Sequence, residues 1–131
     1  MRYHLLIVCF LSTFLFFSQE EKRLALVIGN SNYDKGELKN PVNDALLIAE
    51  TLEKLNFEVI LDTNIANRGE FVEVIAKFGD KRENYDVAFV YYAGHGIQVN
   101  NENFLIPTEE LINTKLEVED YAVSLQKILR Y

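Results

Sequence analysis

The sequence predicts an α/β domain built around a mainly parallel sheet. Its 131 residues are 49% apolar, enough to bury one sizeable core in a single domain. Two uninterrupted apolar runs, residues 24–28 and 87–92, are typical of strands that are buried on both faces. Helical patterns alternate with the strand patterns, and this order indicates parallel pairing through right-handed crossovers.

The first half of the domain shows clear element boundaries. The run 24–28 ends at Gly29, and polar residues up to Gly36 predict a loop. We expect the first helix to begin at Pro41 with Asn40 as its cap, and to end at Asn56 in the left-handed conformation. Its apolar face is expected to comprise Val42, Ala45, Ile48, Ala49, Leu52 and Leu55.

The second half continues the alternation. After a strand at 57–61, Asn67 and Glu70 resemble a capping box at the start of a second helix, whose end Gly79 leaves open. The buried third strand at 87–92 runs into Ala93-Gly94-His95-Gly96, with the rings of the paired tyrosines 91 and 92 on opposite faces. A short fourth strand is expected at 104–106, and Ser124 is expected to cap a last helix.

The first eighteen residues have the pattern of a secretory signal peptide. Residues 5–17 form an uncharged apolar run after Arg2, too short for a typical membrane-spanning helix. We expect cleavage after Ser18 and export, secreted or periplasmic; the alternative is an uncleaved membrane anchor formed by residues 5–17. Cys9, the only cysteine, would be lost on cleavage, which would exclude disulfides and Cys-based metal sites.

The net charge and the scattered acidic residues argue against some classes of ligand. A formal charge of -7 argues against nucleic-acid binding, which needs clustered Lys and Arg. The pattern shows no metal site and implies no cofactor. No membrane contact is expected after signal cleavage, and the oligomeric state is left open.

Candidate chemistry gathers at the carboxyl ends of the predicted strands, where open parallel sheets bind ligands. His95 is the only histidine outside the signal segment and lies between two glycines directly after a strand. Such an imidazole suits a general acid or base, although a loop histidine without a role is an equal alternative. Asp44 either complements the dipole of the first helix or holds a cationic ligand group.

Five segments of the chain carry a family resemblance: residues 23–30 (RLALVIGN), Tyr33, residues 38–45 (LKNPVNDA), residues 91–96 (YYAGHG) and residues 103–107 (NFLIP). Together they resemble the caspase-like cysteine peptidases, most closely the paracaspase and metacaspase branch. The resemblance covers residues 22–131, a partial large-subunit (p20) domain. It implies a three-layer caspase-like sandwich with a mainly parallel central sheet, incomplete at its C-terminal side.

The resemblance also assigns roles to three residues. It implies that His95 is the catalytic histidine of a Cys–His endopeptidase and that the backbone N–H of Gly96 forms part of the oxyanion hole. Asp44 matches the acid of the primary specificity pocket, which implies peptide or protein substrates cleaved after Arg or Lys. We expect the Asp44 carboxylate to be partly buried, since such a group suits a guanidinium through charge-assisted, often bidentate hydrogen bonds.

One departure limits this interpretation. In this family the nucleophilic cysteine lies about 50 residues beyond the histidine, whereas 131 - 95 = 36 residues follow His95. We therefore expect the chain to be an inactive fragment of an active peptidase. The alternatives are a genuine short, non-catalytic protein-binding module and, less compatible with the motifs, an unrelated flavodoxin-like binding domain.

Overall fold

The computed structural model describes residues 20–130, so the expected signal segment and Cys9 lie outside the described part. Three parallel strands, β1 (Arg23–Gly29), β2 (Phe57–Thr63) and β3 (Val87–Ala93), form a sheet in the order β2-β1-β3. The register pairs Gly29 with Thr63 on one side and with Ala93 on the other, so the three carboxyl ends are level. The predicted α/β class with a parallel sheet is confirmed.

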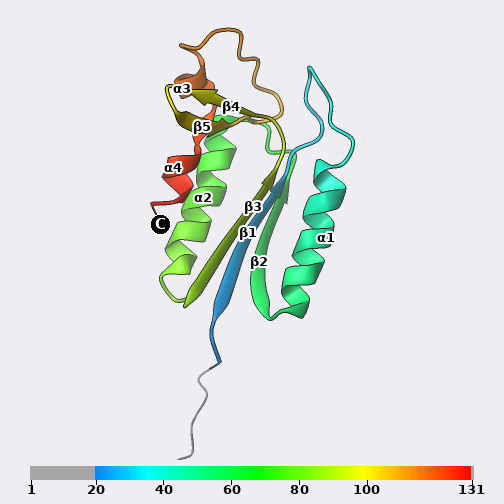
Figure 1. Cartoon of the computed structure of the whole chain (residues 1–131), viewed down its shortest axis with the longest axis vertical. Coiled ribbons are helices and arrows are strands. Elements are labelled where there is room, and N and C mark those ends of the chain that lie inside the picture. The colour runs from blue at the N-terminus through cyan, green and yellow to red at the C-terminus, as the bar shows by residue number, and fades with distance from the viewer. Residues whose placement is uncertain (1–19, 131) are drawn as a thin grey trace, which may run out of the picture.

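Two helices cover opposite faces of this sheet (Figure 1). Helix α1 (Pro41–Lys54) packs on the face formed by Ala25 and Val27 of β1, and helix α2 (Arg68–Arg82) packs on the face formed by the alternate β1 residues. Because β1 is covered on both sides, its residues 24–29 are all buried. The arrangement is the expected three-layer sandwich.

A second, antiparallel sheet follows β3 and was only partly predicted. It contains β4 (Gly96–Val99), β5 (Glu102–Leu105) and β6 (Val123–Ser124), in the order β4-β5-β6. Two short helices, α3 (Val118–Tyr121) and α4 (Leu125–Ile128), flank β6. The expected strand at 104–106 is really at 102–105, and β4 was missed.

The caps of three helices differ in how well the sequence predicted them. Asn67 accepts a hydrogen bond from the Glu70 N–H at 3.0 Å, and Ser124 accepts one from the Gln126 N–H at 3.2 Å, as expected. Helix α1 begins at Pro41 with Asn40 at the cap position, as predicted, but the expected side-chain cap is wrong, because the Asn40 side chain makes no capping bond. Ser31 Oγ instead accepts from the Val42 N–H at 3.2 Å, from the loop that follows β1.

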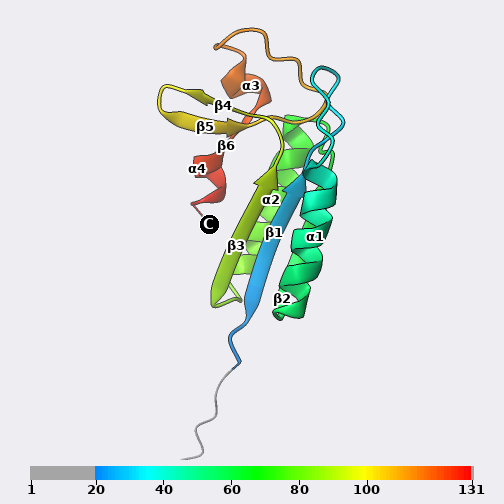
Figure 2. The same cartoon turned by 45° about the vertical axis from the view of Figure 1, so that its right-hand side comes forward.

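Strand β3 is an edge of the described sheet (Figure 2). The expectation that it is buried on both faces is wrong, since none of its residues is fully buried and Phe89 is 40% exposed. An apolar run by itself does not show whether a strand has one neighbour or two. The rings of Tyr91 and Tyr92 do pack on opposite faces, as predicted.

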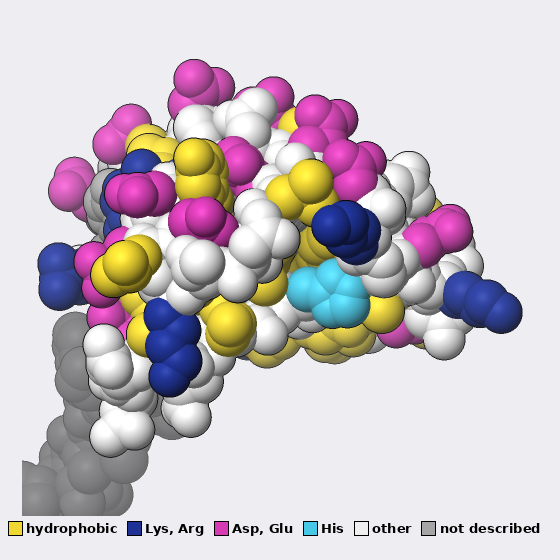
Figure 3. Space-filling model, turned by 90° about the horizontal axis from the view of Figure 1, so that it is seen from above, with side chains coloured by type: hydrophobic (Ala, Val, Ile, Leu, Met, Phe, Trp, Pro, Cys, Tyr) yellow, Lys and Arg dark blue, Asp and Glu magenta, His cyan; other side chains and the backbone are white. Residues whose placement is uncertain are grey.

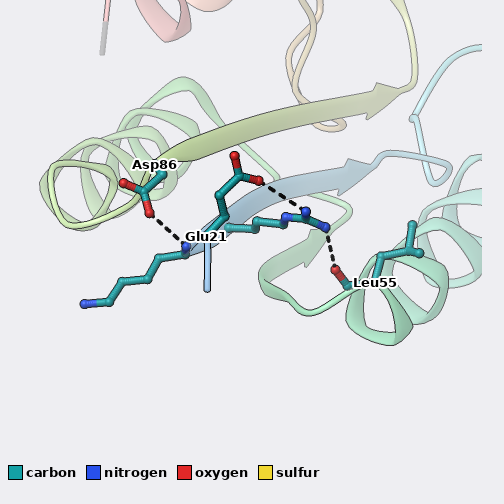
Figure 4. Close-up of polar contacts among 5 residues, drawn as sticks. Glu21, Leu55 and Asp86 are labelled. Carbon is teal, nitrogen blue, oxygen red and sulfur yellow. Dashed lines mark hydrogen bonds and ion pairs between the residues drawn. The ribbon is translucent and has the colours of Figure 1, made fainter. Parts of the chain in front are cut away.

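Polar contacts close the amino end of the sheet, away from the carboxyl edge (Figure 4). The Lys22 N–H donates to Asp86 Oδ2 at 2.9 Å, and Arg23 donates to the Leu55 carbonyl at 3.2 Å and pairs with Glu21 at 3.2 Å. These bonds join the start of β1 to the segments that precede β2 and β3. Within residues 20–130, no helix has the length and apolar character needed to cross a membrane.

Candidate active site

Asn30 makes hydrogen bonds to several chain segments at the carboxyl edge of the sheet. It directly follows β1 and is fully buried. Its backbone N–H donates to the Ala93 carbonyl at 2.8 Å, its Oδ1 accepts from the Ile65 N–H at 3.0 Å, and its Nδ2 donates to the Ile106 carbonyl at 3.3 Å. The side chain of Asn30 therefore links the segments that follow β2 and β5, and its backbone N–H adds a bond to the end of β3.

His95 follows β3 at this edge, and its imidazole has a defined hydrogen-bond partner. Nε2 lies 2.6 Å from the carbonyl oxygen of Gly36, in the loop between β1 and α1. A carbonyl oxygen can only accept, so Nε2 carries the proton of this bond. In the neutral imidazole, Nδ1 is then the unprotonated nitrogen and the available base.

Gly36 is well suited to this contact. Its φ is +80°, in the left-handed region that favours glycine, and a Cβ there would lie 3.2 Å from His95 Nε2. A larger residue would strain the loop and crowd the imidazole. The sequence predicts a loop at Gly36 but indicates no role for it in the site.

Two tyrosines surround the backbone of His95. The Tyr33 ring lies against the imidazole, with 4.3 Å between ring centroids, and its hydroxyl accepts from the His95 N–H at 2.7 Å. The Tyr92 hydroxyl donates to the His95 carbonyl at 2.7 Å. Burial raises the pKa of Tyr92 well above its usual range, so this phenol stays protonated as a donor.

The glycines on either side of His95 provide space rather than unusual backbone angles, since neither has a positive φ. A Cβ on Gly94 would lie 2.6 Å from the hydroxyl oxygens of both Tyr33 and Tyr92. A Cβ on Gly96 would lie 3.2 Å from the Phe104 carbonyl oxygen. Glycine is therefore favoured at positions 94 and 96 because neighbouring atoms approach the backbone closely, and not because the chain makes a tight turn there.

A hollow of about 160 Å³ opens beside the imidazole. Its walls are formed by Tyr33, Lys35, His95, Ile106, Thr108, Glu110, Leu111, Ile112 and Asn113. Seen from above the carboxyl edge, the imidazole reaches the surface among hydrophobic side chains (Figure 3). A larger hollow of about 560 Å³ lies at the amino end and is lined by Glu20, Arg23 and Tyr85 among others, so size alone does not identify the site.

The predicted site residues are only partly brought together. His95 and Gly96 are adjacent at the carboxyl edge, where parallel sheets bind ligands. Asp44 lies in the first turn of α1, is exposed, and forms no ion pair with any residue among 20–130. The expectation of a partly buried carboxylate is therefore wrong for this structure. The described part contains no group of three or more side chains suited to bind a metal ion.

Comparisons with known proteins identify the family of the chain. A caspase domain profile of the peptidase C14 family matches residues 22–130. The human mucosa-associated lymphoid tissue lymphoma translocation protein 1 is 31% identical over 90 residues, which cover 66% of this chain and 11% of that protein. The chain thus spans about a tenth of the length of this relative. The caspase-like resemblance is confirmed, and the chain belongs to the caspase domain family.

Proposed function

We propose that this domain supplies the histidine of a cysteine endopeptidase that cleaves after Arg or Lys. The observation that carries the proposal is the imidazole of His95, which is held by the Gly36 carbonyl at 2.6 Å with Nδ1 left as the base. In this reaction the base removes the thiol proton, the thiolate attacks the peptide carbonyl, and the protonated imidazole then protonates the leaving amine. Family membership supports peptide or protein substrates.

Gly96 and Asp44 complete the proposal on the substrate side. The Gly96 N–H would donate to the oxyanion of the tetrahedral intermediate, next to the base on the same short segment. Asp44 is an acid in the first turn of α1 that no cation among residues 20–130 neutralises. A substrate guanidinium or ammonium group could therefore become its partner.

The nucleophile of this proposal is not among residues 20–130, which contain no cysteine. The thiolate is the attacking species, so residues 20–130 alone should not hydrolyse peptides. The thiol-bearing protein is the polypeptide that contains this domain together with the segment that supplies the cysteine. Among residues 20–130, β3 has β1 as its sheet neighbour and no strand on its other side, which supports a place for that segment beside β3.

A second candidate function is a protein-binding module without catalysis, favoured by the lack of a cysteine in residues 20–130. The two functions are distinguished by the reading frame downstream of the Tyr131 codon. A continuing frame that encodes a strand followed by a cysteine supports the peptidase. A stop codon there supports the binding module.

The decisive assay compares reporter peptides that differ only in Arg, Lys or Asp at the cleaved position, using the thiol-bearing protein. His95→Ala should lower turnover by about a hundredfold to ten thousandfold, the usual contribution of a general base. Asp44→Asn should lower kcat/KM for the Arg reporter by about tenfold to a hundredfold, because a charged hydrogen-bond partner is lost.

Asp34→Asn is the matched control, since Asp34 is another exposed acid in the loop before α1. It should leave the Arg preference unchanged. Faster cleavage after Asp than after Arg would overturn the specificity assignment. Full activity of His95→Ala would overturn the peptidase mechanism.

We also propose that residues 1–18 direct export and are removed after Ser18. The support is the uncharged apolar run at 5–17, which has the length of a signal peptide core. N-terminal sequencing of the protein from the producing cell tests this. A mature chain that begins at Gln19 fits the proposal, and a chain that keeps residues 5–17 would favour the anchor.

A further inference from the structure

We propose that Tyr33 and Tyr92 are positioning residues for His95, and that their two hydroxyls hold its backbone from both sides. The inference rests on the proposed function, because it explains how the base of that reaction is kept in place. Neither tyrosine reaches the imidazole nitrogens through its hydroxyl. Both would act on the reaction through the conformation of His95.

The hydrogen bonds of the two hydroxyls form a consistent set. The Tyr33 oxygen accepts from the His95 N–H at 2.7 Å and can donate its own proton to the Ile106 carbonyl at 3.2 Å. The Tyr92 hydroxyl donates to the His95 carbonyl at 2.7 Å. Each hydroxyl has one proton, and this assignment uses each proton once. The His95 carbonyl also accepts from the Ile106 N–H at 3.1 Å, so the donor and the acceptor of the His95 backbone are both satisfied.

The imidazole is restrained as well as the backbone. The Tyr33 ring lies 4.3 Å from it between centroids, with 58° between the planes, and the Gly36 carbonyl binds Nε2. With the backbone held by the hydroxyls and the ring held by these two contacts, one rotamer and one tautomer are selected. A base that must receive a proton from a thiol benefits from such fixed geometry.

The tyrosines are themselves anchored in the core. Tyr33 is 7% exposed, and Tyr92 packs against Phe71 of α2 at 6.1 Å between centroids. The two hydroxyl oxygens lie 3.2 Å apart, and each would be 2.6 Å from a Cβ at residue 94. Gly94 is thus the residue that makes room for the hydroxyl pair. Tyr33, Tyr92 and Gly94 therefore act together in positioning His95.

The test uses nuclear magnetic resonance on the 131-residue chain with His4→Gln, which leaves His95 as the single histidine. In the parent chain, the His95 amide should be protected from hydrogen exchange, although the residue is only half-buried. The imidazole nitrogen shifts should show the tautomer with a proton on Nε2. An unprotected amide or an even mixture of tautomers in the parent chain would overturn the inference without any further variant.

Single hydroxyl deletions supply the second arm. Tyr33→Phe keeps the ring and removes the acceptor, so the His95 amide should exchange about tenfold faster, which corresponds to about 1.4 kcal/mol. Tyr92→Phe should shift the tautomer signals toward a mixture, because the carbonyl of His95 loses its phenol donor and keeps only the longer bond from the Ile106 N–H. Tyr91→Phe is the matched control on the same strand, since its ring packs on the opposite face, and it should change neither signal.

A purely structural role would lower stability without these local changes. Both Phe variants folded, with His95 exchange and tautomer as in the parent, would therefore refute the positioning role. The measurement needs no thiol, so it is independent of peptidase activity. If the His95 signals respond as expected but the reporter assay fails, the proposed function fails while the positioning of His95 by the tyrosines stands.

Discussion

Replacing Asn30 with alanine tests whether one buried amide organises the carboxyl edge. The substitution removes the acceptor of the Ile65 N–H and one donor to the Ile106 carbonyl. The Ile106 carbonyl keeps a donor in the hydroxyl of Tyr33, whereas Ile65 is 3% exposed and its N–H loses its described partner. Losing a hydrogen bond lowers the free energy of unfolding by about 1 kcal/mol, and leaving a buried N–H without a partner lowers it by about 1–3 kcal/mol more.

The expected loss in the free energy of unfolding is thus about 2–4 kcal/mol, which lowers Tm by about 8–16 °C in a domain of this size. The assay is thermal unfolding followed by circular dichroism. The matched control is Asn32→Ala in the same loop, because Asn32 is exposed and its side chain makes no hydrogen bond within the described residues. It should change the free energy by less than about 0.5 kcal/mol. Equal Tm values for the two variants would refute this account of the edge.

Four further predictions follow from particular contacts. Ser31→Ala should lower the free energy of unfolding by about 1 kcal/mol in urea, because the Ser31 hydroxyl accepts from the Val42 N–H at the start of α1. Asn40→Ala should have no such effect, since its side chain makes no capping bond. A larger effect of Asn40→Ala than of Ser31→Ala would support Asn40 as the cap. Because the pKa of Tyr92 is raised in the folded state, its protonated phenol contributes fully to the free energy of unfolding below pH about 10, where an unfolded tyrosine ionises. Above that pH the contribution is lost at a rate of at most about 1.4 kcal/mol per pH unit. Tyr92→Phe should flatten this alkaline slope, and an unchanged slope would count against a buried phenol. Phe89→Lys should reduce self-association in sedimentation experiments, because it places a charge on the exposed edge strand; increased association would contradict this. The 131-residue chain should not hydrolyse Arg or Lys reporters, and alkylation-sensitive hydrolysis by it would show that another thiol serves.

The repeating elements of the fold were readable from the sequence because local rules determine them. The apolar run at 24–28 matches β1, which is buried on both faces, and the Asn67–Glu70 pair caps α2 as expected. The hairpin of β4 and β5 was missed although its signal is present. Asn100 and Asn101 have φ values of 51° and 63°, which suit a two-residue turn of the mirror-image type.

The interior of the site depends on contacts between distant segments, and the sequence could not supply them. His95 and Gly96 were identified from their position after a strand, together with the family resemblance. The bond from His95 to the Gly36 carbonyl joins residues 59 positions apart, and no local pattern predicts which carbonyl an imidazole will meet. Tyr33 was visible in the resemblance but had no role until its ring and hydroxyl were seen against His95.

The central claim is that His95 serves a thiol in a peptidase that prefers basic residues. Covalent labelling tests it most directly, using peptidyl acyloxymethyl ketones with either Arg or Asp at the reacting position and intact-mass measurement. We predict that the thiol-bearing protein gains one Arg-directed label, that His95→Ala slows labelling by at least about a hundredfold, and that the 131-residue chain gains none. Equal labelling of the His95→Ala variant, or faster labelling by the Asp reagent, would contradict the account.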